Sequence, residues 1–76
     1  MSEIKEHQRV VLTVDLPDQK LNVGDVGTIV HVYNDGRAFE VEFATLTGDT
    51  VAVVSLEMTQ VRNVDHRDVA HARRVA

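Results

Sequence analysis

The clearest pattern in the chain is an alternation of apolar and polar side chains over residues 38–43. In an extended segment, Phe39, Val41 and Phe43 fall on one face, and the residues between them fall on the other. This alternation predicts a strand that is buried on one side only. The preceding segment, 26–33, carries apolar side chains on both faces, which predicts a more central strand of the same sheet.

The connections between the strands read as turns. Asn34-Asp35-Gly36 separates the two strands above, and Asp-Gly is a strong hairpin signal because such turns need positive φ, which glycine adopts without steric cost. Gly48-Asp49 predicts a second hairpin turn, which leads into a valine-rich strand at 50–56. Three consecutive antiparallel strands are therefore expected.

Two further strands complete the predicted sheet. The apolar run at 8–14 ends before Pro17, which lacks the N–H that a strand ladder needs. A short strand at 61–64 follows a segment that suits a single 3₁₀ turn. Five short strands with no helical periodicity before residue 65 predict an all-β, five-stranded antiparallel barrel. The side chains expected to be largely buried are Val10, Leu12, Val26, Ile29, Phe39, Val41, Phe43 and Val54.

The two ends of the chain differ from this middle part. Residues 1–7 are polar and are expected to be flexible, whereas 8–64 form the barrel. In the C-terminal tail, 65–76, Val69 and Ala72 stand at helical spacing, but twelve residues make a marginal helix in water. The tail is therefore either flexible or a short docked helix, and in either form it should be dispensable for folding.

Composition and charge narrow the classes of function. The chain has 76 residues, which is enough for one domain at most. It has no cysteine, which excludes a disulfide and a metal site with thiolate ligands. Up to residue 64 it holds ten acidic and five basic side chains, a net charge of −5, which repels the phosphates of nucleic acids. No run approaches the roughly 18 apolar residues that span a membrane. The expected compartment is the cytoplasm.

Candidate chemistry is sparse. His66 and His71 are five residues apart, not the three or four that place two ligands on one helical face, so no metal site is expected. The Gly24-x-x-Gly27 pattern leads into a strand rather than a helix and lacks the lysine of a phosphate-binding loop. No serine, histidine and acid stand out as a triad. The sequence predicts a protein that is not an enzyme and has no cofactor.

The hairpin around Gly36 is the candidate binding surface, because it places an aromatic ring and mixed charge on a rigid support. The candidate protein-binding residues are His31, Tyr33, Arg37, Glu40 and Glu42. The alternative is that Tyr33 lies in the core and the two glutamates only keep an exposed strand soluble. In that case the loop at 15–23 is the next place to look for a site.

Several stretches resemble a small uncharacterised bacterial family, domain of unknown function 4926. They are Asp15-Leu16-Pro17, Leu21-Asn22-Val23-Gly24-Asp25-Val26-Gly27-Thr28-Ile29-Val30-His31-Val32-Tyr33 and Phe39-Glu40-Val41-Glu42-Phe43. The pattern is also similar to KOW modules and to the barrel of nitrile hydratase β-subunits. The resemblance implies an SH3-like β-barrel and no established activity, since fold analogy confers no function.

These observations favour a non-catalytic protein-interaction module that binds a protein partner or associates with itself. An antitoxin- or immunity-like role, or that of an accessory subunit, would suit an acidic protein that covers a basic surface. The alternative function is a nucleic-acid-binding, KOW-like barrel. The acidic body disfavours this alternative.

Overall fold

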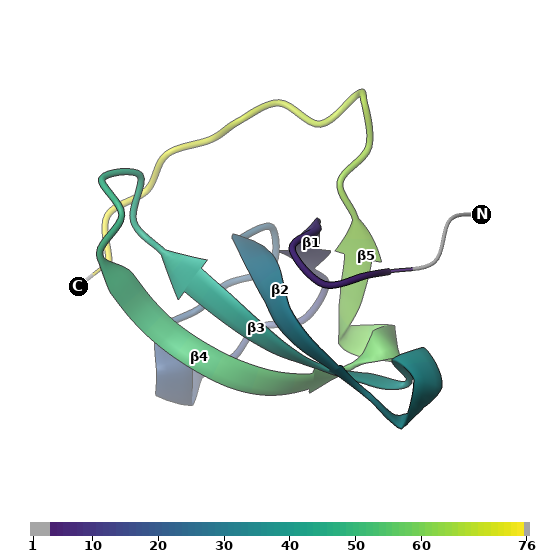
Figure 1. Ribbon diagram of the computed structural model, residues 1–76. Coiled ribbons are helices and arrows are strands. Elements are labelled where there is room, and N and C mark those ends of the chain that lie inside the picture. Colours follow the sequence, from purple (N-terminus) through teal and green to yellow (C-terminus); the bar gives the residue numbers. More distant parts are fainter. Residues whose placement is uncertain (1–3, 76) are drawn as a thin grey trace.

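The regular structure is one antiparallel sheet of five strands, seen in a computed structural model that describes residues 4–75 (Figure 1). The strands are β1 (Arg9–Leu12), β2 (Val26–Tyr33), β3 (Ala38–Ala44), β4 (Thr50–Glu57) and β5 (Val61–Asn63). Their order across the sheet is β4-β3-β2-β1-β5, and neighbours pair antiparallel. The predicted all-β fold with five antiparallel strands is confirmed, and the strand bounds agree to within two residues.

Three single 3₁₀ turns link the strands: η1 (Pro17–Gln19), η2 (Asn34–Gly36) and η3 (Met58–Gln60). They lie at the predicted proline break, the predicted first hairpin turn and the predicted 3₁₀ turn. No α-helix occurs within residues 4–75, so the short-helical form of the tail is wrong as far as residue 75. In the same part of the chain, no helix is long and apolar enough to cross a membrane.

The N-terminal segment is tied to the sheet where the structure describes it. Of the expected flexible segment 1–7, residues 1–3 lie outside the described residues. Ile4 is partly buried and packs against the core. The backbone N–H of His7 donates a hydrogen bond to the carbonyl of Ile29, over 2.7 Å. This segment therefore reaches the middle of β2.

The core lies inside the curl of the sheet. Its buried side chains are Val10, Leu12, Leu21, Ile29, Phe39, Val41, Phe43, Leu56 and Val61. Val54 is partly buried and packs against them. The prediction that Val26 belongs to the core is wrong, because its side chain is 48% exposed. Val26 pairs with Val11 across the sheet, on the face that points away from the core.

β2 departs from regular alternation between Ile29 and His31. Ile29 pairs with Val41 and His31 pairs with Glu40, so Val30 is an extra residue that forms a β-bulge. Strict alternation would put Ile29, His31 and Tyr33 on one face. The bulge instead leaves Ile29 buried and turns His31 and Tyr33 to solvent.

The glycine at position 27 permits a close approach between β2 and β3. A Cβ atom placed there would lie 2.6 Å from Cγ1 of Val41 and 2.9 Å from Cε1 of Phe43. Gly27 is itself buried and pairs with Phe43. A side chain at this position would therefore push the aromatic ring out of the core.

The sheet curls without closing. β4 and β5 are its two edges and do not pair with each other within the described residues. Figure 1 shows β3 and β4 sweeping across the molecule, while β5 stands beyond β1. The predicted barrel is thus open, and β4 presents one free edge over its eight residues.

We expect the Phe39→Ala substitution to destabilise the fold by about 3–5 kcal/mol, since it empties a site that is 1% exposed at the centre of the core. So small a domain has about that much stability in total, so the variant should be largely unfolded at 25 °C. Circular dichroism during urea unfolding measures the change. Leu46→Ala is the control, because Leu46 is 93% exposed and its loss should shift stability by no more than about 0.5 kcal/mol. Equal stability for both variants would contradict this description of the core.

Candidate functional site

Four of the five predicted binding residues share the outer face of the β2–β3–β4 part of the sheet. His31 and Tyr33 are exposed on β2, and Glu40 and Glu42 are partly buried on β3. Arg37 is exposed at the end of the η2 turn, between the two strands. We call these five residues the hairpin patch. The alternative that Tyr33 lies in the core is wrong, since Tyr33 is 40% exposed.

Polar contacts fix the side chains of the hairpin patch. The rings of His31 and Tyr33 meet edge to face, with centroids 4.5 Å apart. Glu40 accepts a hydrogen bond from the hydroxyl of Ser55, and Glu42 accepts one from the hydroxyl of Thr50, each over 2.6 Å. Both hydroxyl donors belong to β4, so the two carboxylates are tied to the edge strand and held on a rigid support.

The edge strand next to the patch is mostly apolar and carries no charge from residue 50 to residue 56. Val53 is 52% exposed on its outer face, and Leu46 and Met58 are exposed before and after the strand. In the described part of the chain, β4 pairs with β3 alone. Natural edge strands are usually shortened, bulged or charged, because an open ladder can pair with another chain. β4 has a register shift near Ala44 but no protecting charge in its middle.

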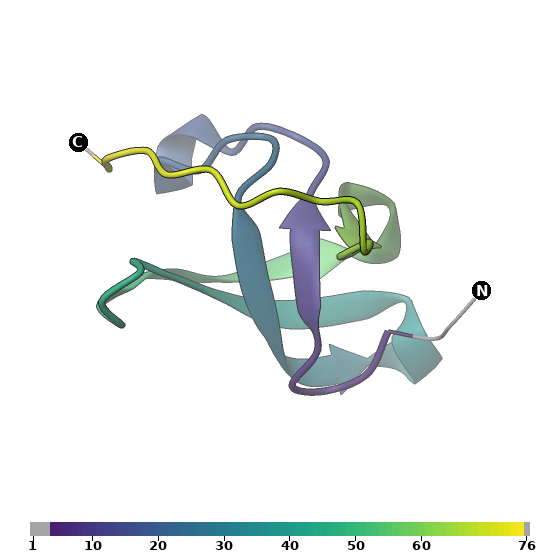
Figure 2. The same ribbon diagram turned by 90° about the horizontal axis from the view of Figure 1, so that it is seen from above.

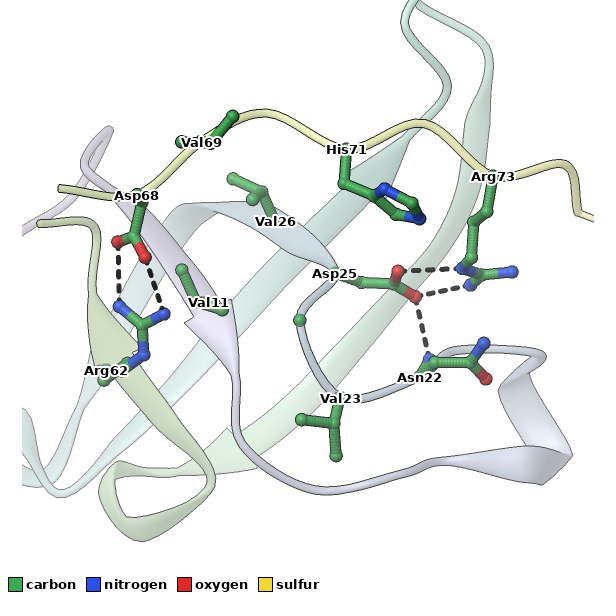
Figure 3. Close-up of a pocket in the computed structure, with 11 residues that line it drawn as sticks. Val11, Asn22, Val23, Asp25, Val26, Arg62, Asp68, Val69, His71 and Arg73 are labelled. Atoms are coloured by element: carbon green, nitrogen blue, oxygen red, sulfur yellow. Dashed lines mark hydrogen bonds and ion pairs between the residues drawn. The ribbon is translucent and has the colours of Figure 1, made fainter.

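A second surface lies on the other half of the sheet, where the C-terminal segment crosses it. We call residues 64–75 the strap; they run in an irregular course over β1 and β2 (Figure 2). Val11 is on this outer face and is nevertheless only 5% exposed. Val11, Val26 and Val69 of the strap line a pocket of about 410 Å³ (Figure 3).

One end of the strap is held by an ion pair between Arg73 and Asp25 (Figure 3). Nε of Arg73 donates to Oδ1 of Asp25 over 2.9 Å, and Nη2 donates to Oδ2 of the same carboxylate. Nη2 also donates to the carbonyl of Lys20 over 3.0 Å. The guanidinium and the carboxylate thus form a two-pronged pair, and the Asp25 side chain is only 18% exposed.

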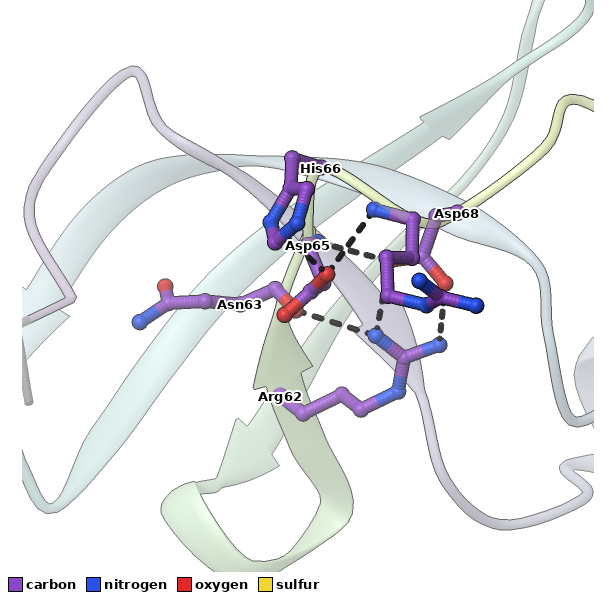
Figure 4. Close-up of polar contacts among 6 residues, drawn as sticks. Arg62, Asn63, Asp65, His66 and Asp68 are labelled. Carbon is purple, nitrogen blue, oxygen red and sulfur yellow. Dashed lines mark hydrogen bonds and ion pairs between the residues drawn. The ribbon is translucent and has the colours of Figure 1, made fainter.

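The other end is held by Arg62 on β5 and Asp68 in the strap (Figure 4). Nη1 and Nη2 of Arg62 donate to the two carboxylate oxygens of Asp68, both over 2.9 Å. The backbone N–H of Asp65 donates to Oδ2 of Asp68 over 2.6 Å. Asp68 therefore binds Arg62 of β5 and also stabilises the turn at which the strap begins.

The two carboxylates of these ion pairs are more acidic than usual. Burial raises the pKa of Asp25, but hydrogen bonds from Arg73 and from the backbone N–H of Asn22 outweigh it, so the pKa is lowered. At Asp68, the hydrogen bonds from Arg62 lower the pKa to about 2. The same pairs raise the pKa values of Arg62 and Arg73. Both pairs are charged at neutral pH.

The loop at 15–23, the second place to look for a site, forms one wall of this strap pocket. A carboxylate oxygen of Asp15 accepts a hydrogen bond from the backbone N–H of Val23 over 2.9 Å, which holds the loop in shape. Asn22 and Val23 line the pocket, and Val23 is 57% exposed. Leu21, in the same loop, is 2% exposed and belongs to the core.

The sequence did not predict the strap or its two partners, Asp25 before β2 and Arg62 on β5. The tail contains three arginines, Arg67, Arg73 and Arg74, and nothing in the sequence singles out Arg73. Its partner Asp25 lies 48 residues earlier, and no local pattern links the two. Within residues 4–75, no three histidine, aspartate or glutamate side chains are grouped so that they could hold a metal ion.

We expect the strap to stay docked at neutral pH and to detach in acid. A lowered carboxylate pKa stabilises the docked form above the ordinary value of 3.8, and this stabilisation fades as the pH falls toward about 2. Carbon-detected NMR titration of the Asp68 carboxyl should give a midpoint near pH 2. In the Arg62→Gln variant the midpoint should move back toward 3.8. If the Asp68 carboxyl titrated with the same midpoint in both proteins, Arg62 and Asp68 would not form an ion pair in solution.

Most of the chain matches the model of a known protein family. The model of a family described as "Domain of unknown function (DUF4926)" matches residues 6–63. Neither a search of curated proteins nor a search of solved structures found a match. The matched range includes all five strands, the hairpin patch, Asp25 and Arg62, and it ends before the strap.

Proposed function

Because the chain belongs to the DUF4926 family, whose description names no function, we propose a function from its own surface. The protein is a non-catalytic interaction module whose β4 edge binds an extended, basic segment of a partner protein. The observation that carries the proposal is the edge of β4 from Thr50 to Leu56, which is uncharged and is not covered by another strand within residues 4–75. Adding a strand to such an edge supplies main-chain hydrogen bonds to the partner.

The neighbouring side chains specify a basic partner. Rows of paired residues run across the sheet to β4: His31, Glu40 and Ser55 form one, and Tyr33, Ala38 and Glu57 form the next. A strand added beyond β4 would extend these rows, with alternate side chains on the glutamate-bearing face. Lysine or arginine at those positions would meet Glu57 directly and lie within the field of Glu40 and Glu42.

The rings of the hairpin patch give this face a further preference for cations. Tyr33 is 40% exposed, and His31 holds its ring edge to face. A guanidinium or ammonium group over an exposed tyrosine ring gains about 0.5–1 kcal/mol. An antitoxin- or immunity-like protein, which covers a basic surface of its partner, is one biological use of such a site. The same acidic face disfavours nucleic acid, whose phosphates it repels.

The test uses a blocked octapeptide of alternating lysine and valine, titrated into the full-length chain. We expect chemical-shift changes in the backbone amides of residues 50–57 and no comparable response to a glutamate–valine octapeptide. Glu40→Lys should weaken binding about fivefold or more, since replacing an attraction by a repulsion at an exposed site is worth about 1 kcal/mol. Asp18→Lys, the same charge change on the distant η1 turn, should leave the affinity within about twofold.

Three outcomes would overturn the proposal. One is no response of the β4 amides to the lysine–valine peptide. Another is equal binding of the lysine and glutamate peptides, because charge would then play no part. The last is sedimentation of the protein alone as a dimer paired through β4, which would make a second copy the natural occupant of the edge.

A further inference from the structure

The strap occupies its surface in the way that a bound peptide would. It crosses the outer face of β1 and β2 in an irregular course, and every residue from 64 to 75 is exposed. Its fixed points are two charged side chains: Asp68 pairs with Arg62 on β5, and Arg73 pairs with Asp25 in the loop just before β2. These charges, rather than buried apolar side chains, hold the strap in place.

The receiving surface and its occupant have different places in the chain. Asp25, Arg62, Val11 and Val26 all lie within the range that matches the family, whereas the strap lies beyond that range. The family domain thus builds the surface, and a segment outside the domain covers it.

The strap fills this surface poorly. Between Asp68 and Arg73 it carries the small or polar residues Val69-Ala70-His71-Ala72. Val69 is 88% exposed although it lines the pocket, and Val26 on the sheet remains 48% exposed. A pocket of about 410 Å³ stays open beside the strap (Figure 3). A ligand with the same two charges and a larger apolar side chain between them would bury more of this valine-lined floor.

We propose that this surface is a recognition site for an extended peptide with a carboxylate and, five residues later, an arginine. In this structure the strap occupies the site in cis as a displaceable substitute for that ligand. The carboxylate pairs with Arg62, and the arginine pairs with Asp25 and with the carbonyl of Lys20, as Asp68 and Arg73 do now. Such a ligand would make the same ion pairs and bury more apolar surface than the strap does, so it can replace the strap.

The strap of the chain and an added peptide would compete for this site, and the competition lowers the measured affinity for the peptide. A strap that is docked about 90% of the time weakens the apparent affinity of an added peptide about tenfold. Removing the charges of Asp68 and Arg73, the two that form the ion pairs, should restore that tenfold factor in affinity. The site is separate from the β4 edge, so this result does not depend on the proposed strand addition.

The experiment compares the full-length wild-type chain with the full-length Asp68→Asn/Arg73→Gln variant, both isotopically labelled. The ligand is a blocked synthetic peptide of residues 64–75. We expect the variant to bind it at least about tenfold more tightly than the wild type, with shifts at the amides of Val11, Asp25 and Val26. A peptide with Asp68→Asn and Arg73→Gln should lose binding to the variant. A peptide with Val69→Phe should bind several-fold more tightly than the native one.

Equal affinity of the native peptide for both chains would overturn the proposal, and so would absence of binding to the variant. Shifts confined to β4 would also overturn it, since the site would then lie elsewhere. Sedimentation of the wild type as a strap-exchanged dimer would assign the occupant to a second copy and likewise contradict it. If the double variant does not fold, the single Arg73→Gln chain gives the same comparison.

Discussion

A single sheet has to enclose its own core in this protein, and the two irregularities of β2 make that possible. At Gly27 the strand comes so close to β3 that a Cβ atom would lie 2.6 Å from Val41. At Val30 a bulge adds one residue and bends the strand. Between these points Ile29 enters the core beside Phe39 and Val41, while His31 and Tyr33 turn outward. The packing of the core and the composition of the outer face therefore follow from the same short stretch of chain.

Because a single sheet curls around the core without closing, it has two edges, β4 and β5, and these differ in length and in contacts. β5 is three residues long, and its Arg62 holds the strap through Asp68. β4 is eight residues long, carries no charge in its middle and pairs with β3 alone among the described residues. An edge of this length presents unpaired N–H and C=O groups that another strand can satisfy. The two proposed docking surfaces lie on opposite halves of the sheet and differ in character: one offers backbone hydrogen bonds, the other two fixed charges.

Much of this fold could be predicted from the sequence, because alternation and turn chemistry are local signals. Phe39, Val41 and Phe43 fell on the buried face as expected, and the hairpin turn at Gly36 was expected as well. Local signals could not reveal the bulge at Val30, which nothing in the residue types marks. Nor could they place Val26, which faces outward opposite Val11. The strap depends on a pairing between residues 25 and 73, and neither helical nor strand periodicity encodes a contact over such a separation.

Native-state hydrogen exchange along β4 tests the central claim, that this edge is open, most directly. In an antiparallel edge strand, alternate residues direct their N–H groups toward the neighbour and the others toward solvent. The amides of residues 50–57 should therefore alternate between slow and fast exchange in the dilute protein, whereas both sets of amides in β3, which pairs with β2 and with β4, should be slow. Fast amides should become slow when the lysine–valine octapeptide is bound. Uniform slow exchange along β4 in the protein alone would mean that the edge is already covered, and would contradict the account.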